Sequence, residues 1–431
     1  MKKVLCVLSM ALLFVSGGVF ANGTSEATSE KTDQGPITVK YAFWGNPDAI
    51  GVENEIIDEF EKTHPNIQIE PIVSAYEDYH EKLMTMIAGN MAPDVMRIDS
   101  YNFADFMTRG ACQNLDQYIE KTNFDMNIYP VAAINEATVD GSVYALPWAT
   151  APLYTFLNIN AFEKAGIDLP PLDWTVDDFV KICHEFKESG TDCYGYSSAV
   201  FIEFFLPFIW ANGGNLLSAD KKTFTLDSDE ACKGIQTIAD LYQDGCIPKD
   251  TVSISEDTIT RWFTNGSIAM RFGSLVDVIS TQKVEGSKFE VWTMPSGIVK
   301  NTTVYKSNEI CLSKDSQVKD AAWEFMKFLR GNEGERLYVK AKRISPSLLN
   351  DDTLWPLYLG GNDGYPKQIK NVTGQIATTY GHGLSLVKGY SELRDSLTPI
   401  FQKIMMGDMT AKEAMAQNKA KFQNIIDRNN K

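Results

Sequence analysis

The sequence is poor in positive charge. Its 431 residues contain 40 Lys and Arg against 56 Asp and Glu, which gives a net charge of −16. A protein that binds the phosphate backbone of a nucleic acid needs a basic stripe, so this composition disfavours DNA and RNA as partners. Gly and Pro number only 30 and 17, too few for a fibrous or disordered chain, and the 44% hydrophobic content is typical of a globular protein. A chain of this length predicts two or three domains.

The motifs of the common enzyme classes are also missing. There is no phosphate-binding loop and no dinucleotide fingerprint. His80-Glu81 and His184-Glu185 each lack the second His of a zinc protease, and the four His and seven Cys show no zinc-ligand spacing. The sequence therefore predicts no catalytic residue, no metal site and no cofactor. A glycoside hydrolase needs only two carboxylates at a suitable separation, so that alternative stays open.

The only long apolar run lies at the N-terminus. Lys2 and Lys3 precede the apolar stretch 4–15, and Val19-Phe20-Ala21 places Val and Ala at the two positions that a signal peptidase recognises. The apolar stretch has 12 residues, far short of the ~20 that span a bilayer. We interpret residues 1–21 as a cleaved secretory signal peptide.

A lipid anchor would require Cys directly after the signal peptide. Asn22 holds that position, and Cys6 lies too early. We therefore expect a soluble periplasmic or secreted protein, in which residues 22–35 form a polar linker.

Disulfides are permitted but not required in such a compartment. Six Cys follow the signal peptide, at positions 112, 183, 193, 232, 246 and 311. Cys183 and Cys193 flank a predicted helix end and turn, which makes them the first candidates for a disulfide, with buried free thiols as the alternative.

Alternating strands and helices follow the linker. The apolar periodicity predicts strand, helix, strand, helix and strand at 37–44, 52–63, 67–73, 77–89 and 94–98. This βαβ order predicts an α/β fold with a parallel sheet. Further helices are expected at 176–186, 228–243, 317–330 and 410–427, and further strands at 143–148, 152–158, 267–273, 289–295 and 308–313. Residues 350–385 show no clear period and are predicted to form a long loop with short turns.

The order of these features resembles the extracellular solute-binding proteins of ABC importers, in particular the group related to maltose-binding and oligosaccharide-binding proteins. The stretches that carry the resemblance are FWGNPD (43–48), DEFEKTHPNIQIE (58–70), KLMTMIAGNMAPDVM (82–96), GSVYALPWAT (141–150), NINAFEKAGIDLPPLDWTVDDF (158–179), WANGG (210–214), FTNGSIAMRFG (263–273) and VKDAAWEFMKFLRG (318–331). Each is weak alone, but together they cover nearly all of the chain after the linker in the family order. The chain departs from the family pattern at 302–309.

The resemblance implies two α/β lobes joined by three crossings, the two-lobed periplasmic-binding-protein fold with a central ligand cleft. Lobe 1 would comprise 36–148 and 270–313, and lobe 2 would comprise 149–269 and 314–431. The hinge strands would lie near 148–153, 269–273 and 313–316. Ligands of open α/β sheets sit at the carboxyl ends of strands, so the strand ends of both lobes would line the cleft.

This geometry nominates ligand-binding residues at strand ends and crossings. Aromatic rings suit the apolar face of a sugar, and carboxylate or amide groups suit its hydroxyls. The candidates are Trp44, Gly45, Asp99, Tyr101, Trp148, Trp210, Asn212, Gly213, Phe272 and Glu309.

The resulting hypothesis is the substrate-binding component of a carbohydrate importer. It would be a monomer that captures a sugar or oligosaccharide between its lobes and delivers it to ABC permease subunits in the membrane. A secreted glycoside hydrolase and a two-lobed sensor that docks on a membrane receptor are the alternatives. The sequence also leaves glycerol phosphate or a polyamine open as the ligand.

Overall fold

The computed structural model describes residues 35–300, 302–360, 364, 366–376, 381–383 and 387–429. The predicted signal peptide, and the predicted linker up to residue 34, lie outside the described residues. The described residues from Pro36 onward belong to one compact unit. Within them, every helix is too short or too polar to cross a membrane.

The first sheet has five strands in the order β2-β1-β3-β12-β6. They are β1 (Ile37–Trp44), β2 (Ile67–Ser74), β3 (Val95–Ile98), β6 (Leu146–Thr150) and β12 (Ser307–Leu312). β1 pairs in parallel with β2 and with β3, which confirms the predicted βαβ arrangement. β12 runs antiparallel to both β3 and β6, so the sheet as a whole is mixed.

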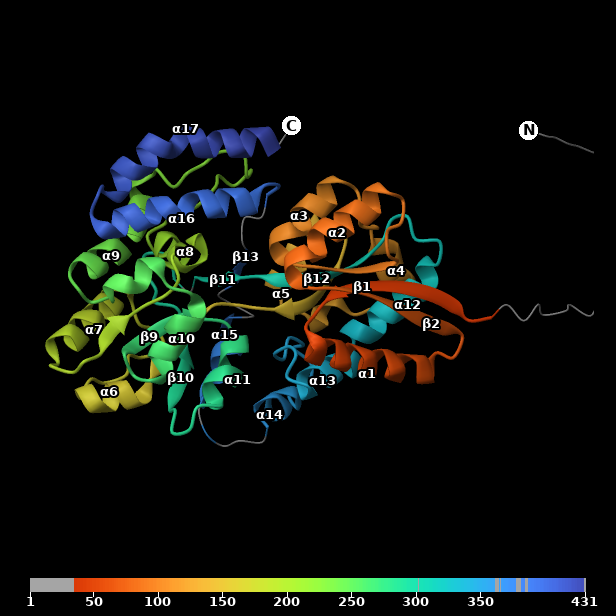
Figure 1. Cartoon of the computed structure of the whole chain (residues 1–431), viewed down its shortest axis with the longest axis horizontal. Coiled ribbons are helices and arrows are strands. Elements are labelled where there is room, and N and C mark those ends of the chain that lie inside the picture. The colour runs from red at the N-terminus through yellow and green to blue at the C-terminus, as the bar shows by residue number, and fades with distance from the viewer. Residues whose placement is uncertain are drawn as a thin grey trace, which may run out of the picture. The chain divides into compact units, whose positions relative to one another are not determined.

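Helices cover both faces of this sheet (Figure 1). α1 (Pro47–Thr63), α12 (Lys319–Arg330) and α13 (Asn332–Lys340) lie on one face, and α2 (Tyr76–Ala88) and α3 (Ser100–Thr108) on the other. Along β1, Val39, Tyr41 and Phe43 face the first group and Ala42 faces the second, as the period of a strand requires. α1 begins where Asn46 accepts a hydrogen bond from the backbone N–H of Ala49.

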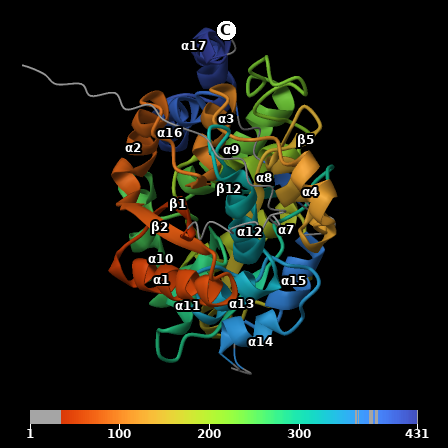
Figure 2. The ribbon, with the colours of Figure 1, turned by 90° about the vertical axis from the view of Figure 1, so that its right-hand side faces the viewer.

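The second sheet has four strands in the order β10-β7-β9-β8. They are β7 (Tyr154–Asn158), β8 (Tyr194–Tyr196), β9 (Ile268–Gly273) and β10 (Phe289–Trp292). α6 (Ile159–Ala165), α7 (Val176–Glu188) and α10 (Glu256–Thr264) contact these strands. α8 (Ile202–Ala211), α9 (Asp229–Gln243), α16 (Tyr390–Met406) and α17 (Ala411–Asn429) pack on one another beside them, as the two views of Figures 1 and 2 show.

Short elements connect the two sheets and their helices. They are α4 (Asp116–Thr122), η1 (Met126–Ile128), α5 (Val131–Glu136), β4 (Thr138–Val139), β5 (Ser142–Val143), η2 (Lys249–Ser253), α11 (Val276–Gln282), β11 (Thr303–Tyr305), α14 (Leu354–Leu359), α15 (Ile369–Gln375) and β13 (Gly381–Gly383). The prediction of a long loop over 350–385 was therefore wrong for α14, α15 and β13. Helices of six or seven residues span fewer than two turns, which is too short to show an apolar periodicity in the sequence. Buried residues such as Tyr358 and Val372 anchor them to the core.

Sheet membership corrects the predicted lobe boundaries. The chain passes from the first sheet to the second between β6 and β7, within the predicted hinge 148–153. The predicted lobe 1 segment 270–313 is divided, however, because β9 and β10 pair in the second sheet with β7 and only β12 joins the first. The predicted hinge at 269–273 is thus strand β9 itself. The chain returns to the first sheet between β10 and β12.

The third predicted hinge also lies elsewhere. Residues 313–316 connect β12 to α12, and both belong to the first sheet and its helices. The chain reaches the second sheet again at α15, which contacts β10. Apolar periodicity marks a strand or helix but does not say which sheet it joins, because that choice depends on pairing between residues far apart in the sequence.

Candidate functional site

Three of the nominated residues meet at the carboxyl ends of β1 and β3. Trp44 ends β1, and its ring centroid lies 6.1 Å from that of Trp148 in edge contact. Asp99 follows β3 and caps α3 by accepting from the backbone N–H of Asn102, and Tyr76 donates its hydroxyl proton to the same carboxylate at 2.5 Å. Parallel neighbouring strands end at the same edge, which is why residues far apart in sequence converge here.

The two Trp differ in exposure. The indole of Trp148 is only 4% exposed, and the guanidinium of Arg97 lies 3.7 Å from its ring centroid. Trp44 is half-buried and packs against Tyr76 and Trp148. Part of the Trp44 ring is therefore accessible to a ligand, whereas the buried Trp148 contributes by packing against Trp44.

Gly45 has a packing role beside Trp44. A Cβ atom at this position would lie 2.9 Å from the Cβ of Ala49, in the first turn of α1. The absence of a side chain allows the helix to begin directly after the strand.

Tyr101 lies where the first lobe contacts the second. Its hydroxyl oxygen accepts a hydrogen bond of 2.9 Å from the ammonium of Lys306. Its ring is stacked on that of Tyr390 at 5.9 Å, with planes 8° apart. Arg394 lies 5.4 Å from the ring centroid of Tyr101 and forms a 2.8 Å ion pair with Glu203. We call these five residues, Tyr101, Glu203, Lys306, Tyr390 and Arg394, the interlobe cluster.

Sequence reasoning found only Tyr101 of this cluster. Glu203 could have been identified from the sequence, because it is a charged residue in the otherwise apolar helix α8. In the structure it is 3% exposed, which is rare for a Glu without a partner. Lys306 stands between β11 and β12, in the segment where the chain departs from the family pattern. Nothing in the sequence distinguishes Tyr390 and Arg394 from the other polar residues of the amphipathic helix α16.

A cavity opens beside Lys306, and we call it the Lys306 cavity. It holds about 430 Å³, counting the solvent at its mouth. It lies at the carboxyl ends of β8 and β9, where a ligand of an α/β sheet is expected. Its walls include the nominated Phe272 and the residues Leu153, Ser198, Phe204, Glu256, Arg271, Ser274, Asp277 and Lys306.

Most charges around this cavity are paired. Arg271 contacts Asp277 at 2.8 Å, and Arg394 contacts Glu203 as described above. Within the described part of the chain, Lys306 and Glu256 form no ion pair, although both face the cavity.

The two unpaired groups respond to burial in different ways. Burial lowers the pKa of the Lys306 ammonium, but the nearby Tyr101, Glu203 and Glu256 outweigh this effect and raise its pKa above the usual value. Burial raises the pKa of the Glu256 carboxyl, and Lys306 partly opposes the rise. The cavity thus presents one cationic group and one carboxyl group that no ion pair satisfies.

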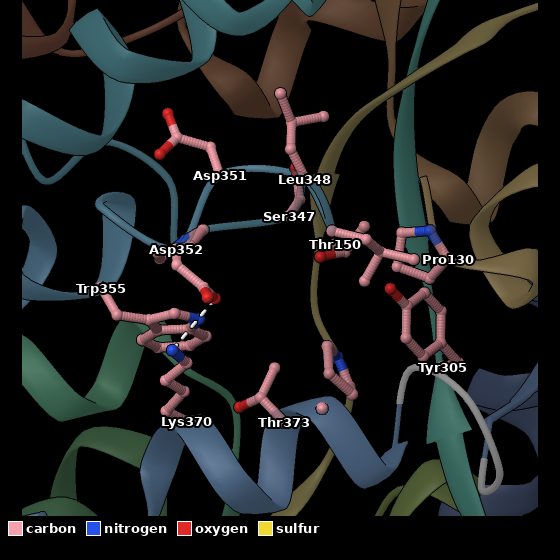
Figure 3. Close-up of a pocket in the computed structure, with 14 residues that line it drawn as sticks. Pro130, Thr150, Tyr305, Ser347, Leu348, Asp351, Asp352, Trp355, Lys370 and Thr373 are labelled. Carbon is pink, nitrogen blue, oxygen red and sulfur yellow. Dashed lines mark ion pairs between the residues drawn. The ribbon is translucent and has the colours of Figure 1, made fainter. Parts of the chain in front are cut away.

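A second cavity lies on the opposite face of the crossing segments (Figure 3). Leu153 and Lys306 line the Lys306 cavity, whereas their chain neighbours Pro152 and Tyr305 line this second one of about 600 Å³. Successive side chains of an extended chain point to opposite sides, which explains the division.

The charges of the second cavity already have partners. Lys370 pairs with Asp352 at 3.0 Å, as the dashed line in Figure 3 marks, and Asp351 pairs with Arg336 at 2.7 Å. Because these groups are satisfied within the protein, the Lys306 cavity is the better candidate for a ligand site.

Of the ten nominated residues, only Phe272 lines the Lys306 cavity, and Tyr101 contacts its lining residue Lys306. Trp210, Asn212 and Gly213 are at the end of α8, where the indole of Trp210 donates to Asn215 and the amide of Asn212 donates to the carbonyl oxygen of Phe208. Gly213 adopts a φ of +87°, which permits the turn after the helix. Glu309 is fully buried on β12, between Ile98 and Pro147, and burial raises the pKa of its carboxyl well above the usual range.

The fold and this site define a class of protein. Two α/β lobes are connected by crossing segments, and a cavity with polar and aromatic walls lies at strand ends of the second sheet, beside the crossing residues Leu153 and Lys306. That is the architecture of a two-lobed periplasmic binding protein. Among the described residues, no group of three or more His, Cys, Asp and Glu is placed to hold a metal ion.

Comparison with known proteins places the chain within that class. The family model for bacterial extracellular solute-binding proteins matches residues 55–350, and the chain belongs to this family. The sn-glycerol-3-phosphate-binding periplasmic protein UgpB of Brucella melitensis is 25% identical over 404 residues, covering 87% of this chain and 90% of the relative.

Solved structures share the fold at low sequence identity. The sugar-binding protein MalE of Xanthomonas citri has a TM-score of 0.78 and 19% identity, covering 91% of this chain and 98% of that one. The ABC substrate-binding protein Lmo0181 of Listeria monocytogenes, in complex with cycloalternan, has a TM-score of 0.75 and 24% identity, covering 90% and 98%. The predicted fold class and family are both confirmed.

Proposed function

We propose that this protein captures an uncharged carbohydrate in the Lys306 cavity and delivers it to the membrane permease of an ABC importer. It would act as a soluble monomer outside the cytoplasm, after removal of residues 1–21, and would leave its ligand chemically unchanged. The observation that carries this proposal is the presence in one cavity of the Lys306 ammonium, which is hydrogen-bonded to Tyr101, and the Glu256 carboxyl group, beside the rings of Phe204 and Phe272. Neither charged group forms an ion pair among the described residues.

A sugar satisfies this combination of groups. Each hydroxyl both donates and accepts hydrogen bonds, so Lys306 can donate to ligand oxygens while Glu256 accepts from ligand hydroxyls. The apolar C–H face of the sugar ring suits the aromatic wall. An anionic ligand would meet the carboxyl of Glu256, and a polyamine would meet the ammonium of Lys306, so either would leave one unfavourable contact.

The interlobe contacts support a capture mechanism. Lys306 binds Tyr101, and the backbone N–H of Gly389 donates to Asp105 of α3 at 3.4 Å, so α3 of the first lobe contacts α16 of the second. A ligand that bridges the lobes binds this closed arrangement more tightly than an open one and shifts the equilibrium toward it. The closed form would be the one that the permease recognises.

Thermal-shift screening tests the ligand class. The panel would contain neutral mono- and oligosaccharides, uronic acids, sn-glycerol-3-phosphate and spermidine. A ligand at a hundredfold excess over its Kd stabilises the native state by about 2.7 kcal/mol, which is readily detected as a rise in Tm. We expect neutral sugars to raise the Tm. Stabilisation by the polyamine or the phosphate ester alone would contradict the proposal, and release of reducing sugar from a bound glycan would favour the glycoside hydrolase.

The first testable prediction concerns Lys306. We expect Lys306→Met to weaken sugar binding by about 10- to 100-fold, because a hydrogen bond to a charged group contributes about 1.5–3 kcal/mol. Isothermal titration calorimetry with the best sugar from the screen measures the change. Lys249→Met, at an exposed position of η2, is the matched control and should leave the affinity unchanged.

Tyr101→Phe distinguishes ligand binding by Lys306 from its hydrogen bond to Tyr101. This variant keeps the stacked ring and removes only the hydroxyl that Lys306 contacts. If Lys306 binds the ligand, Lys306→Met should cost more affinity than Tyr101→Phe. Equal losses would mean that Lys306 acts only by holding the lobes together.

A further inference from the structure

Two cysteines of the first lobe lie on neighbouring segments of chain. Cys112 follows α3, and Cys311 is in β12. Cys112 is the antiparallel bridge partner of Ser313, and the backbone N–H of Gln113 donates to the carbonyl oxygen of Leu312 at 2.9 Å. Because side chains alternate along paired strands, Cys112 projects to the same face as Ser313 and Cys311.

The two thiols are in contact. Both cysteines belong to the same buried cluster, with Met96, Phe103 and Phe106. Burial, and then a hydrogen bond with Cys112, raises the pKa of the Cys311 thiol well above its usual value. From this placement, we propose that Cys112 and Cys311 form a disulfide once the chain is in an oxidising compartment.

Three of the other four cysteines contact groups that are not thiols. All six cysteines beyond the signal peptide are buried free thiols in this structure. The thiol of Cys193 donates to the carbonyl oxygen of Tyr194, and that of Cys232 donates to Leu226. The sulfur of Cys246 lies 3.4 Å from a ring nitrogen of His184. The pairing of Cys183 with Cys193, predicted from their flanking positions, has no such thiol–thiol contact among the described interactions.

An oxidant can approach the pair from the side of Cys112. This residue lines an open cavity of about 960 Å³, counting solvent at its mouth, together with Met107, Tyr144 and Lys314. Cys311 is fully buried behind it. Cys112 is therefore the thiol that meets a small disulfide oxidant first, and Cys311 is the thiol that completes the reaction.

The chemistry is a two-step thiol–disulfide exchange. The Cys112 thiol loses its proton, and its thiolate attacks one sulfur of the oxidant and expels the other as a thiolate. Cys311 then loses its proton and attacks the Cys112 sulfur of the mixed disulfide, which releases the second half of the oxidant. Two protein thiols are oxidised to a disulfide, and the oxidant disulfide is reduced to two thiols.

The bond would stabilise the elements that carry the proposed binding site. It joins the segment after α3, the helix of Tyr101, to β12, the strand that begins directly after Lys306. All four strands of the second sheet lie between the two cysteines in sequence, so the closed loop is long. A cross-link over a long loop restricts the unfolded chain and favours the native state.

Thiol counting on the full exported chain tests the proposal. The purified protein is incubated with oxidised glutathione or with a phosphine reductant, unfolded in guanidinium chloride and alkylated with a maleimide. We expect alkylation of all six thiols after reduction and two fewer after oxidation. Peptide mass spectrometry should then find the Cys112 and Cys311 peptides linked. Six reactive thiols after oxidation, or a link between other cysteines, would overturn the proposal.

Variants and melting curves provide a second measurement. Cys183→Ser should still lose two thiols on oxidation, whereas Cys112→Ser should lose none. The oxidised wild type should melt several degrees above the reduced wild type, and Cys112→Ser should show no such difference. Because the comparison of oxidised and reduced wild type needs no substitution, the test remains decisive even if a Cys variant folds poorly. Equal Tm values for the two wild-type forms would contradict a stabilising disulfide.

Discussion

Replacing Glu53 with Gln is expected to lower the free energy of unfolding by about 3–5 kcal/mol. Glu53 on α1 forms an ion pair with Arg97 on β3, and both side chains are completely buried. Removing one partner leaves the other charge buried and uncompensated, which costs far more than the pair itself contributes. Urea unfolding followed by Trp fluorescence at pH 7 measures the loss.

The surroundings of this pair explain the size of the effect. Tyr338 on α13 donates its hydroxyl proton to Glu53 at 2.7 Å, and Arg97 donates to the hydroxyl of Tyr41. Burial would lower the pKa of the Arg97 guanidinium, but Glu53 and the two Tyr outweigh it and keep the group charged. The pair therefore holds α1, β3 and α13 together, and the Arg97 charge cannot be relieved by loss of a proton.

A matched control is available on the same helix. Glu59 forms an ion pair of 2.8 Å with Lys62, three residues along α1, but both side chains are exposed. Glu59→Gln should change the stability by less than about 1 kcal/mol, because exposed ion pairs contribute little. Equal losses in the two variants would show that the buried pair is not the cause.

The second large effect is a pH dependence centred on Glu136. Burial raises the pKa of this α5 carboxyl to about 8, with Lys221 partly opposing the rise. The nearby Glu309 is fully buried, and burial and then Glu136 raise its pKa well above the usual range. Two carboxyl groups in one buried region cannot both ionise at low cost.

The sign of the effect follows from proton binding. A carboxyl whose pKa is raised in the native state binds more protons there than in the unfolded chain, so stability falls as pH increases. The loss begins near the unfolded pKa of 4.5 and continues to the native pKa of about 8. Each unit corresponds to about 1.4 kcal/mol, so the full change is at most roughly 5 kcal/mol.

Glu136→Gln should remove the part of this dependence that Glu136 contributes, while the buried Glu309 keeps its own part. The variant is expected to match the wild type at pH 5, where Glu136 is protonated in the native state, and to be the more stable protein at pH 8. Denaturant unfolding across this range measures the difference. Glu120→Gln, which changes an exposed residue of α4, serves as the control and should follow the wild-type curve. A wild-type stability that does not fall between pH 5 and pH 8 would be incompatible with these buried neutral carboxyls.

Much of the fold was predictable because its signals are local. The βαβ order of β1, α1, β2, α2 and β3 was read from apolar periodicity, and the parallel pairing confirms it. A capping box of Thr175 and Asp178 fixes the start of α7. Thr410 and Glu413 exchange the same hydrogen bonds at the start of α17. In each case the interacting residues lie within a few positions of one another.

The candidate site was predictable only in part. Phe272 was nominated at a crossing and lines the Lys306 cavity. Trp44, Asp99 and Trp148 were nominated from strand ends and crossings; they meet one another at the ends of β1 and β3 but do not line that cavity. Trp210 was nominated by the same logic, but it lies in the last turn of α8 and does not line the Lys306 cavity. Position at the end of an element does not specify the direction in which a side chain points.

The sequence by itself determined the class of protein: an acidic α/β chain with a predicted export signal, whose ordered motifs resemble the solute-binding family. Tertiary structure alone decided which strands joined which sheet, and it brought Lys306 and Glu256 to one cavity and Cys112 beside Cys311. These arrangements depend on contacts between residues far apart in the chain. Such contacts leave no local period or spacing in the sequence, because they arise only when the sheets and helices pack against one another.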